Sequence, residues 1–276
     1  MTAAGSPLAG LTVLVPRSRD QASGFSALLR DRGAEPLEVP TIEIHPVAST
    51  ARLDQAVRDL AAGRYDWMAL TSVNGVAAVR ARVEALGLGP QALTTAKVAA
   101  VGPATEAALR DWGVDPDLVP EVATTAALGE SFPSCPSGGP PGPSDPAWPS
   151  RTGGSGRVLL ARADLANPEL AVLLRDKGWD PVEVVAYHTV PVGSLDPAAR
   201  RRLDGGEVDW VAFTASSTVE GFLRGYGGPP PPGVRVAAIG PVTADTARAA
   251  GIRVAATASE HTIAGLVAAI EHAVVP

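Results

Sequence analysis

Three blocks of this chain occur twice in the same order, and this internal repeat limits what the chain can fold into. Residues 11–46 return as residues 157–191, with Arg17 matching Arg162. The other two blocks, WMALTSVNGVAAV and KVAAVGPATEAALRDWGV, return as WVAFTASSTVEGF and RVAAIGPVTADTARAAGI. A doubled sequence predicts two similar lobes, and a chain of 276 residues is long enough for each lobe to bury its own core.

Every block alternates a short apolar strand with a helix. Residues 11–15 form an apolar run that is typical of a buried parallel strand. The segment after it spaces its apolar residues as a helix does, with Gly33 placed to cap the helix. Because the other blocks repeat this order, the predicted fold class is α/β, with doubly wound parallel sheets that helices cover on both faces.

Composition and charge exclude several kinds of site and partner. The net charge of −6 repels nucleic acid and anionic membranes, so an acidic ligand needs local hydrogen-bond donors. Cys135 is the single cysteine and the histidines are scattered, so we expect no metal. The sequence shows no secretory segment and no apolar run long enough to span a membrane, so we expect a cytoplasmic protein. We also expect a monomer that binds a small-molecule substrate.

Residues 133–155 interrupt the pattern with proline, glycine and serine. Such a composition cannot bury enough apolar surface to offset the entropy of ordering, so we expect a mobile, disordered insertion here. A proline-rich motif that binds a partner is the alternative, although the flanking residues show no basic or aromatic pattern.

Four turns follow strands at the edge where open α/β sheets bind their ligands. Each turn leads into a helix and offers backbone N–H groups and polar side chains at its positive end, which suits carboxylate or phosphate oxygens. The same residue types are preferred helix N-caps, so capping alone is the alternative for any single turn. The Gly-Pro turns match neither dinucleotide-binding nor Walker patterns, which disfavours a nucleotide ligand. The candidate ligand-binding residues of these turns are Thr71, Ser72, Asn74, Gly102, Thr105, Thr214, Ser216, Gly240 and Thr243.

Three further side chains have two interpretations each. Arg17 and Arg162 end matching first strands, where a guanidinium could bind a ligand carboxylate or form a surface ion pair. Tyr187 lies in the extended segment VVAYHTVPV. Its phenol could give a proton to a leaving hydroxyl, or it could be a half-buried tyrosine of a strand.

Together, these residues resemble the uroporphyrinogen-III synthase family. The resemblance covers nearly the whole chain, and the number and order of its motifs make it specific. The motifs are the strand ending in Arg17, the segment Pro40-Thr41-Ile42, TSVNGV from Thr71, VGPATEAAL from Val101, Tyr187-His188-Thr189, FTASSTVEGF from Phe213 and IGPVTADTA from Ile239. One difference between the two copies of the second block lies in this turn: Ala215 in the second copy stands where the first copy has Ser72.

The resemblance implies two flavodoxin-like lobes joined by a two-stranded β-ladder. Lobe one would combine residues 1–39 with 193–276, lobe two would be residues 45–188, and residues 40–44 and 189–192 would be the crossing strands. The repeat itself is equally compatible with two lobes that follow one another along the chain.

The resemblance also implies a lyase that cyclises linear hydroxymethylbilane, with loss of water and inversion of the last ring, to uroporphyrinogen III. No metal or cofactor is implied, and the enzyme would act mainly by orienting the ring ends. Tyr187 would help hydroxide to leave, while Arg17 and the residues of the four turns would bind substrate carboxylates. The alternatives are a homologue that binds anions without chemistry and a regulatory homologue.

Overall fold

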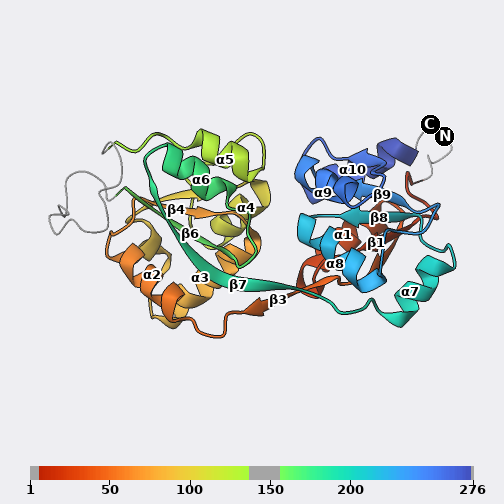
Figure 1. Ribbon diagram of the computed structural model, residues 1–276, viewed down its shortest axis with the longest axis horizontal. Coiled ribbons are helices and arrows are strands. Elements are labelled where there is room, and N and C mark those ends of the chain that lie inside the picture. The colour runs from red at the N-terminus through yellow and green to blue at the C-terminus, as the bar shows by residue number, and fades with distance from the viewer. Residues whose placement is uncertain (1–5, 137–155, 275–276) are drawn as a thin grey trace. The chain divides into compact units, whose positions relative to one another are not determined.

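The computed structural model describes residues 6–136 and 156–274 of the chain, which fall into two compact units. Unit 1 combines Met1–Ile44 with Thr189–Pro276, and unit 2 is His45–His188. Both boundaries lie inside strands, β3 (Ile42–Pro46) and β7 (Asp180–Pro191), which are neighbours in one sheet. Figure 1 shows a sheet with helices packed around it in each unit.

Unit 1 is built on a five-stranded sheet in the order β10-β9-β8-β1-β2, and all four strand pairs are parallel. The strands are β1 (Thr12–Val15), β2 (Glu35–Glu38), β8 (Trp210–Phe213), β9 (Arg235–Ala238) and β10 (Ala256–Thr257). The helices are α1 (Arg19–Asp31), α7 (Pro197–Asp204), α8 (Ser216–Tyr226), α9 (Pro241–Ala249) and α10 (Ile263–Val274).

Neighbouring residues of the unit 1 strands enter opposite cores. Val13 and Val15 of β1 pack with residues of α1 and α10, whereas Leu14 packs with residues of α7, α8 and α9. Strand β8 divides in the same way, with Trp210 in the first core and Phe213 in the second. Because side chains alternate along a strand, this division places helices on both faces of the sheet, as the continuous apolar strands predicted.

Unit 2 repeats the plan, with strand order β3-β7-β6-β4-β5. The pairs β4–β5, β4–β6 and β6–β7 are parallel. The other strands are β4 (Trp67–Leu70), β5 (Lys97–Ala100) and β6 (Arg157–Ala163). The helices are α2 (Ala51–Ala61), α3 (Val73–Ala85), α4 (Pro103–Asp111), α5 (Thr125–Ser131), α6 (Glu169–Asp176) and the 3₁₀ helix η1 (Pro90–Leu93). The predicted α/β class with parallel sheets in two units is confirmed.

The start of the expected insertion needs a correction. Residues 133–136 were expected to be mobile, but Cys135 is buried in the core that includes Trp67 and Leu160. The Nε1 of Trp179 donates to the Pro133 carbonyl at 2.7 Å, and the Cys135 N–H donates to the Lys177 carbonyl at 2.8 Å. These partners are far away in the sequence, so local composition could not indicate them. The rest of the expected insertion, residues 137–155, lies outside the described residues.

The repeat preserves one contact at the amino ends of the strands. In unit 1 the Asp209 carboxylate accepts from the Thr12 N–H at 2.8 Å, and in unit 2 the Asp66 carboxylate accepts from the Arg157 N–H at 3.1 Å. Each aspartate directly precedes a buried tryptophan that starts a strand. The two copies therefore join the starts of neighbouring strands by the same hydrogen bond.

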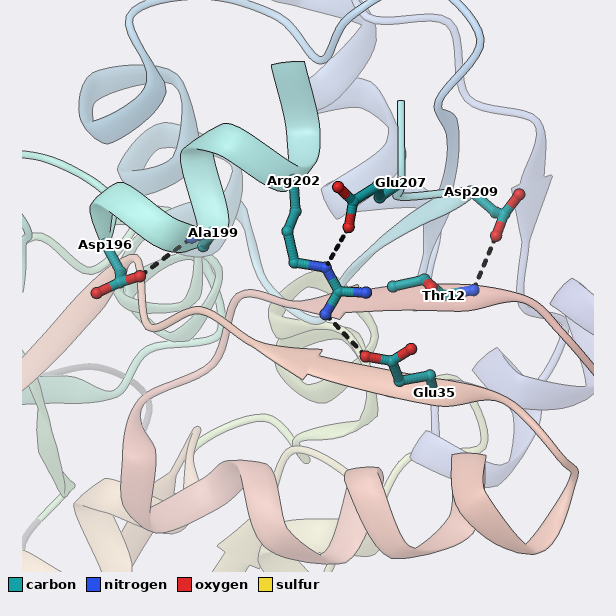
Figure 2. A network of polar contacts seen from close by, with 7 residues as sticks. All are labelled: Thr12, Glu35, Asp196, Ala199, Arg202, Glu207 and Asp209. Carbon is teal, nitrogen blue, oxygen red and sulfur yellow. Dashed lines mark hydrogen bonds and ion pairs between the residues drawn. The ribbon is translucent and has the colours of Figure 1, made fainter. Parts of the chain in front are cut away.

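Charged side chains reinforce this amino edge in unit 1 (Figure 2). Arg202 of α7 donates to Glu35 of β2 at 2.7 Å and to Glu207 at 3.1 Å. The hydrogen bond from Arg202 also lowers the pKa of the Glu35 carboxyl. These ion pairs lie at the starts of the strands, so we assign them a structural role, because ligands of open α/β sheets bind at the opposite edge.

Thr41 is fully buried at the end of unit 1 that leads into β3. Its hydroxyl lies 2.9 Å from the Pro16 carbonyl, to which it can donate, and 3.2 Å from that of Thr218. A Cβ on Gly221 of α8 would overlap the backbone oxygen of Thr41. Glycine at this position therefore allows α8 to pack directly against the chain that leaves the unit.

We predict that Gly221→Ala destabilises the protein by about 1–3 kcal/mol, because the added methyl group must displace backbone. Gly24→Ala is the matched control, since Gly24 also lies inside a helix of unit 1 and a Cβ there would contact nothing within 4 Å. We expect the control to stabilise by about 0.5–1 kcal/mol through helix propensity. Urea unfolding measures both changes, and equal stabilities for the two variants would contradict the packing argument.

Candidate functional site

The candidate site begins at the carboxyl edge of the unit 2 sheet, where α3 starts. Ser72 caps α3, and its Oγ accepts from the Gly75 N–H at 3.0 Å. A Cβ on Gly75 would lie 3.0 Å from the carbonyl oxygen of Ala161 in β6, so the first turn of α3 packs tightly against that strand. The predicted turn is thus both an N-cap and part of the sheet edge.

Tyr187 of β7 reaches this turn. Its hydroxyl lies 2.8 Å from the Ser72 Oγ, and Asn74 also forms a side-chain hydrogen bond with it. The tyrosine is 8% exposed. Of the residues predicted from the sequence, Ser72, Asn74 and Tyr187 are therefore brought into direct contact.

A register shift between β6 and β7 places Tyr187 there. Arg162 pairs with Val185, but the next residue, Ala163, pairs with Tyr187, so Ala186 has no counterpart. Val185 is exposed, and simple alternation would put Tyr187 on the same side of β7 as Val185. The extra residue instead turns Tyr187 inward, as β-bulges often do near functional sites.

The surroundings of the phenol act on its pKa in opposite directions. Burial raises the pKa of Tyr187, and the negative charge of Asp164 raises it further. Hydrogen bonds from Ser72 and Asn74 lower this pKa by stabilising the phenolate, although the net pKa remains raised. The phenol thus holds its proton at neutral pH, and the groups that would stabilise the anion after the proton leaves are already in contact with it.

The loop after β6 adds residues that the sequence interpretation did not assign to the site. The Asp164 Oδ2 lies 2.8 Å from the His188 Nδ1, and the Asp164 N–H donates to the Tyr187 carbonyl at 3.3 Å. Arg162 does not serve as a ligand arginine, because its guanidinium is paired with Glu183 and donates to the Asn167 carbonyl at 2.7 Å. An aspartate directly after a strand was the available signal for this loop.

Unit 1 lacks the hydroxyl pair. In the register that aligns Pro46 with Pro191, Ile42 stands where Tyr187 does, and Ala215 stands where Ser72 does. Thr218 compensates at the helix start by accepting from the Ala215 N–H at 3.2 Å, and the Ser216 hydroxyl lies 2.7 Å from that of Thr246. The two copies share a fold, but only unit 2 has a phenol beside a helix N-terminus at this position.

The two Gly-Pro turns are alike in both units. Gly102 and Gly240 each precede a helix with proline at its start, and a Cβ on either would overlap the following loop at Ala123 or His261. The predicted ligand residues of these helices, Thr105 and Thr243, are 3% and 5% exposed. The exposed residues of these turns are Pro103, Ala104, Pro241 and Val242, so the threonine hydroxyls do not lie at the surface.

The remaining predicted residues lie partly buried at the ends of strands. Thr71 follows β4, Thr214 follows β8, and Arg17 lies two residues beyond β1. Burial lowers the pKa of the Arg17 guanidinium. The hydrogen bonds of the Tyr187 cluster described above do not involve these three residues, so their binding of a ligand stays a prediction.

Two features are absent from the described part of the chain. Among residues 6–136 and 156–274, no group of three or more His, Cys, Asp or Glu side chains could hold a metal ion. Within those residues, no helix is long and apolar enough to cross a membrane.

Comparison with known proteins identifies the family. The sequence model described as uroporphyrinogen-III synthase HemD matches residues 23–268. The uroporphyrinogen-III synthase of Synechococcus elongatus is 32% identical over 97% of this chain and 97% of its own length. The chain therefore belongs to the uroporphyrinogen-III synthase family, and the predicted resemblance is confirmed.

Other relatives agree with this assignment. The porphyrin biosynthesis protein HemD of Ruminiclostridium josui is 28% identical over 90% of this chain, which spans only 45% of that protein. A crystal structure of a mutant uroporphyrinogen III synthase from Thermus thermophilus matches with a TM-score of 0.63 and 24% identity, over 95% of this chain and 98% of the other. This structural likeness supports the fold.

We predict that Ser72→Ala raises the pKa of Tyr187 further, because the phenolate loses a hydrogen bond. The variant should also lose about 0.5–2 kcal/mol of stability, because α3 loses its N-cap. Ultraviolet difference titration of tyrosinate, with Tyr187→Phe as the reference, measures the pKa.

Thr124→Ala is the control for the Ser72 variant. Thr124 caps α5 by accepting from the Ala127 N–H at 3.1 Å, so its loss should cost similar stability without moving the titration of Tyr187. An unchanged or lowered pKa of Tyr187 in Ser72→Ala would contradict the proposed contact.

Proposed function

We propose that this chain is a uroporphyrinogen-III synthase, which cyclises hydroxymethylbilane to uroporphyrinogen III and inverts the last ring. The observation that carries the proposal is the Tyr187 phenol, buried in unit 2 and 2.8 Å from the hydroxyl that caps α3. Relatives named as uroporphyrinogen-III synthases support the same reaction.

The substrate is acidic, whereas the protein carries a net charge of −6. Binding must therefore come from local donors, and the starts of α3, α4, α8 and α9 offer backbone N–H groups at the positive ends of helices. Hydrogen bonds to charged groups contribute about 1.5–3 kcal/mol each, so several of them suffice to hold the substrate. We propose Arg17, Thr71, Thr214 and Ser216 as additional binding residues, with Gly102, Thr105, Gly240 and Thr243 contributing through their turns.

The proposed chemistry begins with the terminal hydroxymethyl group. The hydroxyl leaves with both electrons of the C–O bond and takes the phenol proton of Tyr187, so it departs as water. The pyrrole nitrogen stabilises the resulting azafulvene-type cation. Attack through the substituted position of the last ring gives a spiro intermediate, which fragments and recloses, and the proton lost on rearomatisation returns to the phenolate.

The arrangement around Tyr187 suits this acid role. Burial and Asp164 keep the phenol protonated at rest, while Ser72, Asn74 and the positive end of α3 stabilise the phenolate once the proton has moved. Unassisted substrate closes to the type I isomer, so the bound geometry must also prevent direct closure.

The experiment supplies freshly made hydroxymethylbilane and separates the products by isomer. We expect type III product, formed faster than spontaneous closure. Type I product alone at the spontaneous rate would contradict the proposal and favour a homologue that binds anions without chemistry.

We predict that Tyr187→Phe lowers kcat by about 10²-fold, the lower end of the range for general acid catalysis, and leaves product binding nearly unchanged. Tyr226→Phe is the matched control, because the Tyr226 hydroxyl donates to Asp204 at 2.8 Å in unit 1 and has no part in the proposed chemistry. Equal losses of kcat and product affinity in Tyr187→Phe would remove the acid role.

A further inference from the structure

Asp164 and His188 form a polar pair next to the proton donor, and the reaction outlined above gives the pair no role. Their side chains are 30% and 39% exposed, and the Asp164 Oδ2 and His188 Nδ1 are 2.8 Å apart. A polar pair that is this exposed contributes little to the stability of a protein. Stability alone is therefore a weak reason for this arrangement.

Asp164 contacts both halves of the Tyr187-His188 dipeptide. Its side chain binds the imidazole of His188, and its backbone N–H donates to the carbonyl of Tyr187 at 3.3 Å. This contact comes directly after the register shift that leaves Ala186 without a counterpart. The aspartate thus closes the bulge through its backbone, while its carboxylate lies at the His188 imidazole.

The loop that carries Asp164 is itself anchored. Arg162 is buried, pairs with Glu183 of β7 and donates to the carbonyl of Asn167 at 2.7 Å. Both ends of the short segment from Asp164 to Asn167 are therefore tied to β6 and β7. A carboxylate held in this way acts as a preorganised charge, which needs no rearrangement when charge develops beside it.

We propose that Asp164, held by His188, is the counter-charge for the cation that forms when the terminal hydroxyl leaves the substrate. The inference rests on the proposed function. The cation arises where Tyr187 gives up its proton, and Asp164 contacts the backbone of that residue and the side chain of the next.

The field of this carboxylate reaches the phenol. Asp164 raises the pKa of Tyr187, after the larger effect of burial, whereas Ser72 and Asn74 at the start of α3 are neutral donors that lower it. The carboxylate thus has two opposing effects: it disfavours the phenolate, and it would stabilise the cation. The kcat of variants that lack the charge shows which effect controls the rate.

Asp164→Asn is the decisive variant. Asparagine can still accept from the His188 imidazole and donate its backbone N–H to Tyr187, so the bulge stays closed while the charge is removed. We predict that kcat falls about tenfold with KM nearly unchanged, because a partly exposed charge contributes less than a fully buried one. Asp164→Glu keeps the charge and should retain more activity than Asp164→Asn.

Two further variants separate position from charge. His188→Gln keeps a donor for the Asp164 carboxylate and should remain close to the parent protein, whereas His188→Ala releases the carboxylate and should lose several-fold in kcat. Asp115→Asn is the control for removal of a negative charge from unit 2, because the Asp115 side chain is 92% exposed. It should leave kcat unchanged.

A titration tests the charge without any substrate. Ultraviolet difference titration should show tyrosinate from Tyr187 forming at lower pH in Asp164→Asn than in the parent protein, with Tyr187→Phe as the reference. Failure of the parent protein to form type III product would reject the proposed function, whatever the variants do. An active parent whose Asp164→Asn variant keeps full kcat, or an unchanged titration of Tyr187, would overturn the role of Asp164.

Discussion

The register shift between β6 and β7 determines where Tyr187 lies, and the candidate site depends on it. In a regular parallel pair the tyrosine would lie on the same side of the strand as the exposed Val185. The unpaired Ala186 turns the phenol toward the start of α3, where Ser72 and Asn74 bind its hydroxyl. The sheet thus brings a residue from one strand to the capping turn of another, and Asp164 closes the distortion from the next loop.

Positions that the two units share support the fold, whereas the candidate site uses positions at which they differ. Both keep an aspartate that joins the starts of neighbouring strands, and both keep a Gly-Pro turn at the start of a helix. They differ at the hydroxyl pair, where unit 1 has Ile42 and Ala215 in place of Tyr187 and Ser72. Both members of the pair differ between the two copies, which is consistent with a role for the pair that one unit alone performs.

The sequence predicted the fold class because the repeat and the apolar strands are local patterns. The sequence did not predict that Ser72 and Tyr187 touch. Their contact depends on a one-residue register shift at Ala186, and the amino-acid composition gives no sign of that shift. The same limit explains why Arg162 was a candidate ligand residue, since its partner Glu183 lies on a neighbouring strand. Cys135 was placed in a mobile insertion because its burial depends on distant residues such as Trp67.

A crystal structure of the protein with uroporphyrinogen III bound tests the central claim most directly. The account predicts that the inverted ring lies beside the Tyr187 hydroxyl, within reach of the loop that carries Asp164. It also predicts that Ala186 remains unpaired in that structure. A product ring held away from Tyr187, or a regular β6–β7 register that turns the phenol into solvent, would contradict the account.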